Sequence, residues 1–205
     1  MERRWLVYPY HLWMLLFTVA PLALIFFFAF TNQGSWTFTL DNIRQAAEPL
    51  YLRVLGHSVW LAALATFLCF LIGYPLAMIL AQSRVKYRHM MMMLIIVPMW
   101  MNFLLRTYSW MTLLEKNGLI NAVLRFFHLG PVHILYTDGA VLLGMVYNFL
   151  PFMILPIYSV LTKMDRSLLE AAGDLGADAW TSFRRVTFPL SLPGVYAGML
   201  MVFMP

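Results

Sequence analysis

The histidine and serine side chains are the obvious candidates for catalysis or metal binding, but their spacing supports neither. Among the 5 histidines, His128 and His133 lie five residues apart in a loop, which is not a pattern typical of zinc ligands. His57 and Ser58 are adjacent, but no third member of a catalytic triad is near them in the sequence. The phosphate-binding pattern GxxxxGK does not occur. We therefore expect no catalytic residue, no metal site and no ATP hydrolysis by this chain itself.

Four polar side chains interrupt segments that are otherwise apolar: Asn102, Arg106, Tyr147 and Asn148. Charged and amide groups are costly inside a bilayer, so these residues are candidates to line a solute pathway. Two alternatives stay open. Arg106 could extend its guanidinium to the membrane interface, and the other three could form hydrogen bonds between helices.

A polar stretch, LLEAAGDLGADAWTSFRRVTFPL at residues 168–190, separates two apolar segments. Ser167 and Glu170 have the spacing of a capping box, which predicts that a short helix begins at Ser167. Gly173 and Gly176 can end that helix, and Asp178 can cap a second one that ends at Pro189. On local chemistry alone, the stretch is a pair of capped helices at a membrane surface.

The elements that must position these residues are membrane spans. The chain has 205 residues, of which 62% are hydrophobic and 11% charged, so lipid is the expected solvent. Five apolar segments predict an all-α integral membrane protein: residues 11–30, 58–81, 90–114, 139–161 and 190–205. The last covers 16 residues, fewer than the roughly 20 that cross a bilayer, so we expect a truncated fifth span.

The distribution of lysine and arginine predicts the orientation of these spans. The side of the N-terminus and of residues 168–190 carries nine basic residues, and the other side carries five. Because basic residues concentrate in cytoplasmic loops, we expect a cytoplasmic N-terminus. The net charge of +5 is explained in the same way, and nucleic acid is not expected as a partner.

The polar stretch as a whole resembles the EAA signature of the membrane subunits of binding-protein-dependent ABC importers. Glu170-Ala171-Ala172 is followed by three residues, Gly176, nine residues, Val186, one residue and Phe188-Pro189. Val186 and Phe188 replace the isoleucine and leucine of the signature, and all of its spacings are kept.

This resemblance implies a type I ABC importer fold with six spans, of which five are visible here. It implies that residues 165–189 form a cytoplasmic coupling loop held by an ATPase subunit. Its contact residues would be Glu170, Ala171, Ala172, Gly173, Asp174, Leu175, Gly176 and Ala177. The implied partners are an ATPase dimer, which binds ATP and magnesium, a second permease subunit, a periplasmic solute-binding protein and membrane lipid. No cofactor is expected on this chain.

Three further segments, at residues 55–81, 94–110 and 144–177, look most like the first permease subunit of spermidine/putrescine-type importers. The expected function is therefore import of a small polar solute, with a polyamine preferred, across a bacterial inner membrane by alternating access. Other small solutes stay open. An ion-coupled secondary transporter is disfavoured, because no Asp or Glu lies within an expected span. The expected division is residues 1–57, with the first span and an outer loop, and 58–205, the truncated permease core.

Overall fold

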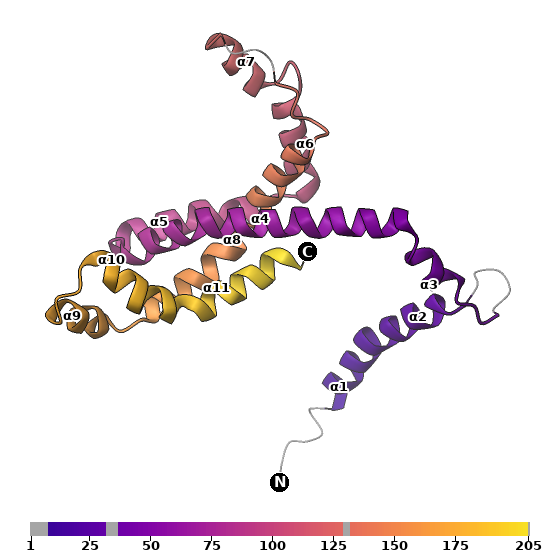
Figure 1. Ribbon diagram of the computed structural model, residues 1–205, viewed down its shortest axis with the longest axis horizontal. Coiled ribbons are helices and arrows are strands. Elements are labelled where there is room, and N and C mark those ends of the chain that lie inside the picture. The colour runs from indigo at the N-terminus through magenta and orange to yellow at the C-terminus, as the bar shows by residue number, and fades with distance from the viewer. Residues whose placement is uncertain (1–7, 32–36, 129–131, 205) are drawn as a thin grey trace. The chain divides into compact units, whose positions relative to one another are not determined.

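The computed structural model describes residues 8–31, 37–128 and 132–204, which form two units, Met1–Ser58 and Val59–Pro205 (Figure 1). Apart from one isolated bridge between Thr31 and Phe38, the regular structure of the described residues is helical. Four of their helices are long and apolar enough to cross a membrane: Tyr8–Ala29, Pro49–Gln82, Asp138–Lys163 and Ala179–Phe203. The predicted all-α membrane fold is confirmed.

The first unit holds one long apolar helix. It consists of α1 (Tyr8–Met14), a π-helical segment η2 (Leu15–Val19) and α2 (Ala20–Ala29). The short α3 (Asp41–Ala46) is tied to the end of α2, because the Asn42 side chain donates to the carbonyls of Phe28 at 3.0 Å and Thr31 at 3.2 Å. The helix α4 (Pro49–Gln82) begins nine residues before the expected start of the second span. The expected outer loop is therefore shorter than the apolar pattern indicates.

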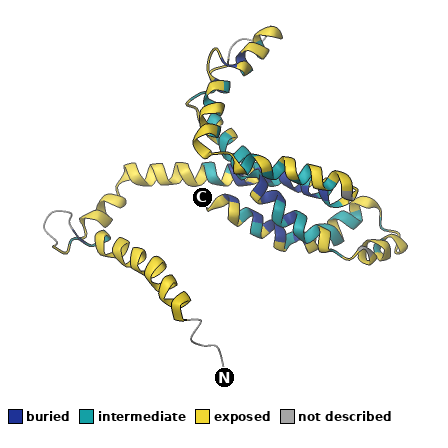
Figure 2. Cartoon of the chain, turned by 180° about the vertical axis from the view of Figure 1, so that it is seen from behind, coloured by how far each residue is buried: buried dark blue, intermediate teal, exposed yellow. Residues whose placement is uncertain are grey.

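The core of the second unit is formed by α4, α8 (Asp138–Lys163) and α11 (Phe188–Phe203), as the buried residues in Figure 2 show. Two glycines bring α11 against the backbone of α8. A Cβ atom on Gly194 would lie 2.8 Å from the Pro156 carbonyl oxygen, and one on Gly198 would lie 3.1 Å from that of Met153. The pair follows the small-xxx-small pattern by which membrane helices approach closely.

The third apolar segment is broken. It contains α5 (Val85–Ile96), the 3-10 turn η3 (Val97–Trp100) and α6 (Phe103–Leu114), with α7 (Leu119–Phe126) following. The two arms, Lys86–Trp100 and Phe103–Phe126, are bent by 97° and count as a fifth span only if taken together. Pro98 lies in the turn before the break, where its ring and missing NH oppose a continuous helix. The break comes before Arg106.

The expectation that Pro189 ends a helix is wrong. Helices α10 (Ala179–Ser182), η4 (Phe183–Thr187) and α11 run on as one helix of 25 residues, Ala179–Phe203. The wider π-helical turn η4 precedes Pro189, and such a turn accommodates a ring that would clash with the carbonyl four residues earlier. The helix that contains the expected fifth span, 190–205, therefore begins eleven residues earlier than expected.

Candidate functional site

The loop between α8 and α11 begins with α9 (Arg166–Asp174), and Asp165 is the residue that caps it. The Asp165 carboxylate accepts from the backbone NH of Ser167 at 3.0 Å. Hydrogen bonds from the backbone and side chain of Ser167 hold the pKa of Asp165 below its usual value. The predicted capping box is therefore wrong: Ser167 lies inside the first turn, and no hydrogen bond of the described residues joins it to Glu170. Glu170 is left available for another contact.

The end of α9 is built around Gly176. Its φ angle is +79°, in the left-handed region, where side chains with a Cβ atom are strained. Gly176 donates to the Gly173 carbonyl at 2.8 Å, and Ala177 donates to the Ala172 carbonyl at 3.0 Å. This pair of bonds is a Schellman motif, which explains physically why glycine occupies this position. Gly173 does not end the helix as expected, because it lies within α9.

Asp178 caps the second short helix, as predicted. Its carboxylate accepts from the backbone NH of Thr181 at 3.1 Å, and the hydroxyl and NH of Thr181 hold the pKa of Asp178 below its usual value. The loop therefore consists of two capped helical segments joined by one defined turn. Such a unit can be displaced as a rigid body.

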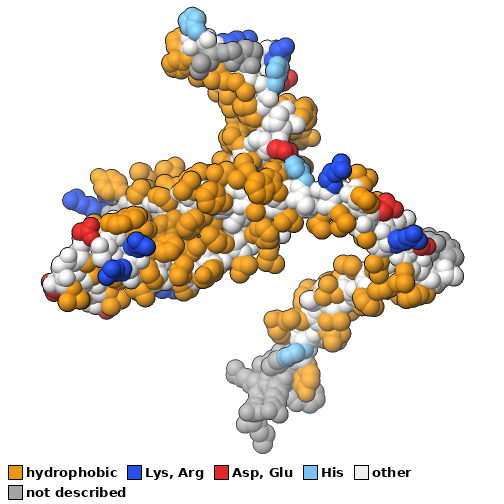
Figure 3. All heavy atoms as spheres, viewed as in Figure 1, with side chains coloured by type: hydrophobic (Ala, Val, Ile, Leu, Met, Phe, Trp, Pro, Cys, Tyr) orange, Lys and Arg blue, Asp and Glu red, His pale blue; other side chains and the backbone are white. Residues whose placement is uncertain are grey.

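The loop lies at one end of the second unit, beyond the ends of α4, α5 and α8 (Figure 1). Charged side chains gather at this end, next to helix surfaces that are mainly apolar (Figure 3). Of the eight expected contact residues, Ala172 and Ala177 are half-buried and the other six are exposed. Leu175 is 89% exposed in the turn that ends α9, the tip of the loop, and burial of an apolar side chain against a partner is favourable, so Leu175 is a candidate contact residue.

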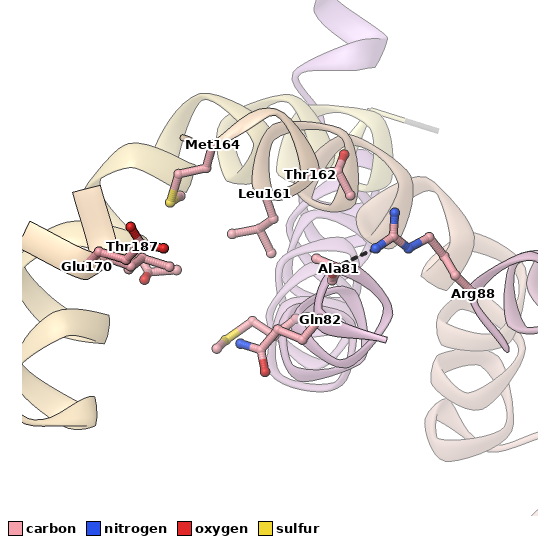
Figure 4. A pocket seen from close by; sticks show the side chains of 10 residues that line it. Ala81, Gln82, Arg88, Leu161, Thr162, Met164, Glu170 and Thr187 are labelled. Atoms are coloured by element: carbon pink, nitrogen blue, oxygen red, sulfur yellow. Dashed lines mark hydrogen bonds between the residues drawn. The ribbon is translucent and has the colours of Figure 1, made fainter. Parts of the chain in front are cut away.

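A cavity of about 480 Å³ lies between the loop and the ends of the spans α4, α5 and α8. Glu170 and Thr187 line one side, and Ala81, Gln82 and Arg88 line the other (Figure 4). Arg88 donates to the carbonyls of Ala81 and Ser83, each at 3.1 Å, and so fixes the last turn of α4. The loop thus adjoins the ends of α4, α5 and α8 without filling the space between them.

The structure brings three of the four pathway candidates together. Arg106 donates to the Pro98 carbonyl at 3.2 Å, across the break, and its guanidinium carbon lies 5.9 Å from the centre of the Tyr147 ring. Arg106 and Asn148 both line a cavity of about 370 Å³ between α6 and α8. The side-chain oxygen of Asn148 is buried and has no hydrogen-bond partner among the described residues. Asn102, the fourth candidate, caps α6: its side-chain oxygen accepts a hydrogen bond from the backbone NH of Leu104 at 2.9 Å.

Sequence reasoning missed the contacts that hold the spans to each other. Gly194 and Gly198 are visible in the sequence as GVYAG, a small-xxx-small pattern in an apolar segment. Tyr74 and Ser191 form a buried hydrogen bond of 2.8 Å, but they are separated by 117 positions and no local pattern connects them.

Comparison with known proteins gives the family. The profile of the family described as "Binding-protein-dependent transport system inner membrane component" matches residues 73–205. The spermidine/putrescine transport system permease proteins PotB of Haemophilus influenzae and Escherichia coli are each 40% identical to this chain over 200 residues. These alignments cover 94% of the chain, and 70% and 73% of the two relatives.

A solved structure agrees on the fold. It is a bacterial ABC transporter involved in the import of the acidic polysaccharide alginate, with a TM-score of 0.80 and 20% sequence identity. The match covers 98% of this chain and 72% of that one. The chain therefore belongs to the family of binding-protein-dependent inner membrane components, and it is a multi-pass, non-catalytic permease subunit of an ABC importer.

Proposed function

We propose that this chain is the permease subunit of a polyamine importer, which moves spermidine or putrescine inward by alternating access. The observation that carries this proposal is the 40% identity to spermidine/putrescine permeases over 94% of the chain. The chain itself binds no nucleotide. ATP and magnesium belong to a partner ATPase dimer, and a second permease subunit and a periplasmic solute-binding protein complete the transporter.

The partner ATPase holds the α9–α10 loop. Two features support this assignment: capped ends and a fixed turn make the loop rigid, and Leu175 is exposed at its tip. An exposed leucine side chain that enters a pocket on a partner stabilises the complex by removing its apolar surface from water. When the ATPase dimer closes, it displaces the loop, and rigid-body displacement of a packed element is a known route from subunit closure to rearrangement.

The loop and the N-terminus lie in the cytoplasm. Nine of the lysine and arginine residues lie on this side, against five on the other, which follows the positive-inside tendency of membrane proteins. Arg3 and Arg4, which contribute to the count, lie outside the described residues. Labelling of single cysteines introduced on either side, in intact cells with an impermeant reagent, tests the orientation.

The solute passes near the cavity between α6 and α8. Asn148 lines this cavity, and a side-chain amide oxygen can accept a hydrogen bond from an amine. Arg106 is held by the Pro98 carbonyl and by the face of Tyr147, and these contacts keep its charge at one wall of the cavity. Selectivity for the polyamine then rests chiefly with the binding protein, because the acidic residues of the described span segments lie at helix ends: Asp138 in the first turn of α8 and Glu115 directly after α6.

The proposal is tested by ATP hydrolysis in liposomes that contain the assembled transporter. We expect the loaded binding protein to stimulate hydrolysis with spermidine or putrescine, and not without a polyamine. Leu175→Ala should reduce both ATPase association and stimulation, whereas Leu200→Ala, at an exposed leucine of α11, should change neither. Stimulation by another solute alone would contradict the polyamine assignment. Normal association of the Leu175→Ala variant would contradict the role of the loop tip.

A further inference from the structure

A buried pair of hydroxyl groups joins α4 to the helix that leaves the α9–α10 loop. The Tyr74 hydroxyl lies 2.8 Å from the Ser191 hydroxyl. Ser191 is 0% exposed and Tyr74 is 5% exposed, so neither group exchanges this bond for water. The described core residues that surround this pair are mainly apolar.

The direction of this hydrogen bond follows from counting protons. The Ser191 hydroxyl donates to the Phe188 carbonyl at 2.8 Å, and a serine hydroxyl has a single proton to donate. Tyr74 is therefore the donor to Ser191. The result is a chain from Tyr74 through Ser191 to the backbone of Phe188, the first residue of α11.

Phe188 is also the residue at which the π-helical turn η4 ends. Its backbone NH donates to the Phe183 carbonyl, five residues earlier, which closes the wide turn. The Tyr74 ring contacts both residues, with centroid distances of 5.8 Å to Phe183 and 5.7 Å to Phe188. Tyr74 thus touches both ends of η4 with its ring and reaches the turn after it with its hydroxyl. π-Helical turns are frequent at functional sites.

The three core helices are connected to the loop in different ways. The chain enters the loop from α8 and leaves it through η4 into α11, and these two spans meet at backbone distance through Gly194. The helix α4 is not adjacent to the loop in the sequence, so it can follow the loop only through noncovalent contacts. On the η4 side, α4 is held through the side chain of Tyr74.

We infer that Tyr74 and Ser191 are positioning residues for transport, which transmit displacement of the α9–α10 loop to α4 through η4. The inference rests on the proposed function of the loop. Without the hydroxyl chain, the loop still moves with α8 and α11, but α4 follows less closely, so ATP hydrolysis proceeds with less solute moved.

The test uses Tyr74→Phe in the reconstituted transporter, because this change keeps the ring and removes only the donor. The matched control is Tyr158→Phe on α8, where a half-buried tyrosine hydroxyl has no hydrogen-bond partner among the described residues. Polyamine transported per ATP hydrolysed, maximal rates, KM values and the thermal unfolding midpoint of the complex are measured for both. Ser191→Ala and the double variant complete a mutant cycle.

We expect Tyr74→Phe to lower the polyamine transported per ATP about fivefold, the factor that corresponds to a typical buried hydrogen bond. The rate of hydrolysis and the KM for the loaded binding protein should stay unchanged, and Tyr158→Phe should behave as wild type. Adding Ser191→Ala to Tyr74→Phe should cause no further loss, because both changes break the same chain.

An unchanged transport ratio for Tyr74→Phe would overturn the inference. So would a fall in stability with equal losses of hydrolysis and transport, since that result indicates a merely structural role. Additive effects in the double variant would show that the two hydroxyls do not act together. A wild-type transporter without polyamine-stimulated hydrolysis would instead overturn the proposed function itself, and the two failures are therefore distinguishable.

Discussion

Replacing Gly194 by alanine tests the close packing of α8 and α11, which holds both ends of the loop. The new Cβ would lie 2.8 Å from the Pro156 carbonyl oxygen and 3.0 Å from the Ile157 Cα, where ordinary contact begins near 3.4 Å. Both neighbours are backbone atoms and cannot rotate away. The two helices must therefore separate by about half an ångström, which forfeits roughly a quarter of the dispersion attraction between facing atoms.

The expected magnitude is a net loss of about 1 to 2 kcal/mol in the free energy of unfolding. Overpacking destabilises the fold by about 1 to 3 kcal/mol. Replacing glycine by alanine within a helix offsets up to about 1 kcal/mol of this loss, because alanine loses less conformational entropy on folding. For a chain of this size, the unfolding midpoint of the purified complex should fall by about 2 to 8 °C.

The matched control is Gly144→Ala, on the same helix α8. No atom lies within 4 Å of the Cβ position of Gly144, so alanine should leave the midpoint unchanged or raise it. Thermal unfolding of both variants in detergent, followed with a thiol-independent probe such as intrinsic tryptophan fluorescence, makes the comparison. Equal midpoints for Gly194→Ala and Gly144→Ala would refute the close approach of α8 and α11.

Three further changes test the loop and the cavity. Gly176→Ala should reduce coupled uptake more than Gly176→Asn, because asparagine tolerates the left-handed region better, and equal uptake by both would contradict the need for that turn. Asp178→Ala should speed hydrogen exchange at the Thr181 amide while Asp178→Asn preserves its protection. Because the folded pKa of Asp178 is lowered, its cap is intact above the ordinary value of 3.8 and is lost as pH falls through the folded value; protection that does not change over that range would contradict the cap. Asn148→Leu should raise the KM for solute with an unchanged unfolding midpoint, whereas a lower midpoint alone would identify Asn148 as a contact between helices.

The apolar spans and the loop were predictable because their signals are local. A run of apolar residues long enough to cross a bilayer has few alternatives to a helix, since lipid offers no partner to backbone polar groups. Gly176 is likewise set by the conformation of one turn. The role of the loop residues in binding an ATPase stays a prediction, as does the division of the chain into domains.

The cap of α9 and the course of the chain past Pro189 were not predictable from local patterns. Asp165 and Ser167 are both favourable caps, and the capping-box spacing favoured the serine. The structure ends α8 at Lys163 and begins α9 at Arg166, so Asp165 is the residue that caps it. Pro189 is typical of a helix boundary, but a π-helical turn packed against Tyr74 carries the helix through it. The second outcome involves a contact, between Tyr74 and Phe183, that is distant in the sequence.

The most direct test of the central claim is uptake of labelled spermidine and putrescine by liposomes that contain the assembled transporter and its binding protein. ATP is enclosed on the side that carries the α9–α10 loop. We predict accumulation that requires hydrolysable ATP and the binding protein, and that persists when ion gradients are collapsed. Polyamine accumulation driven by an ion gradient without ATP, or ATP-driven accumulation of another solute with no polyamine uptake, would contradict this account.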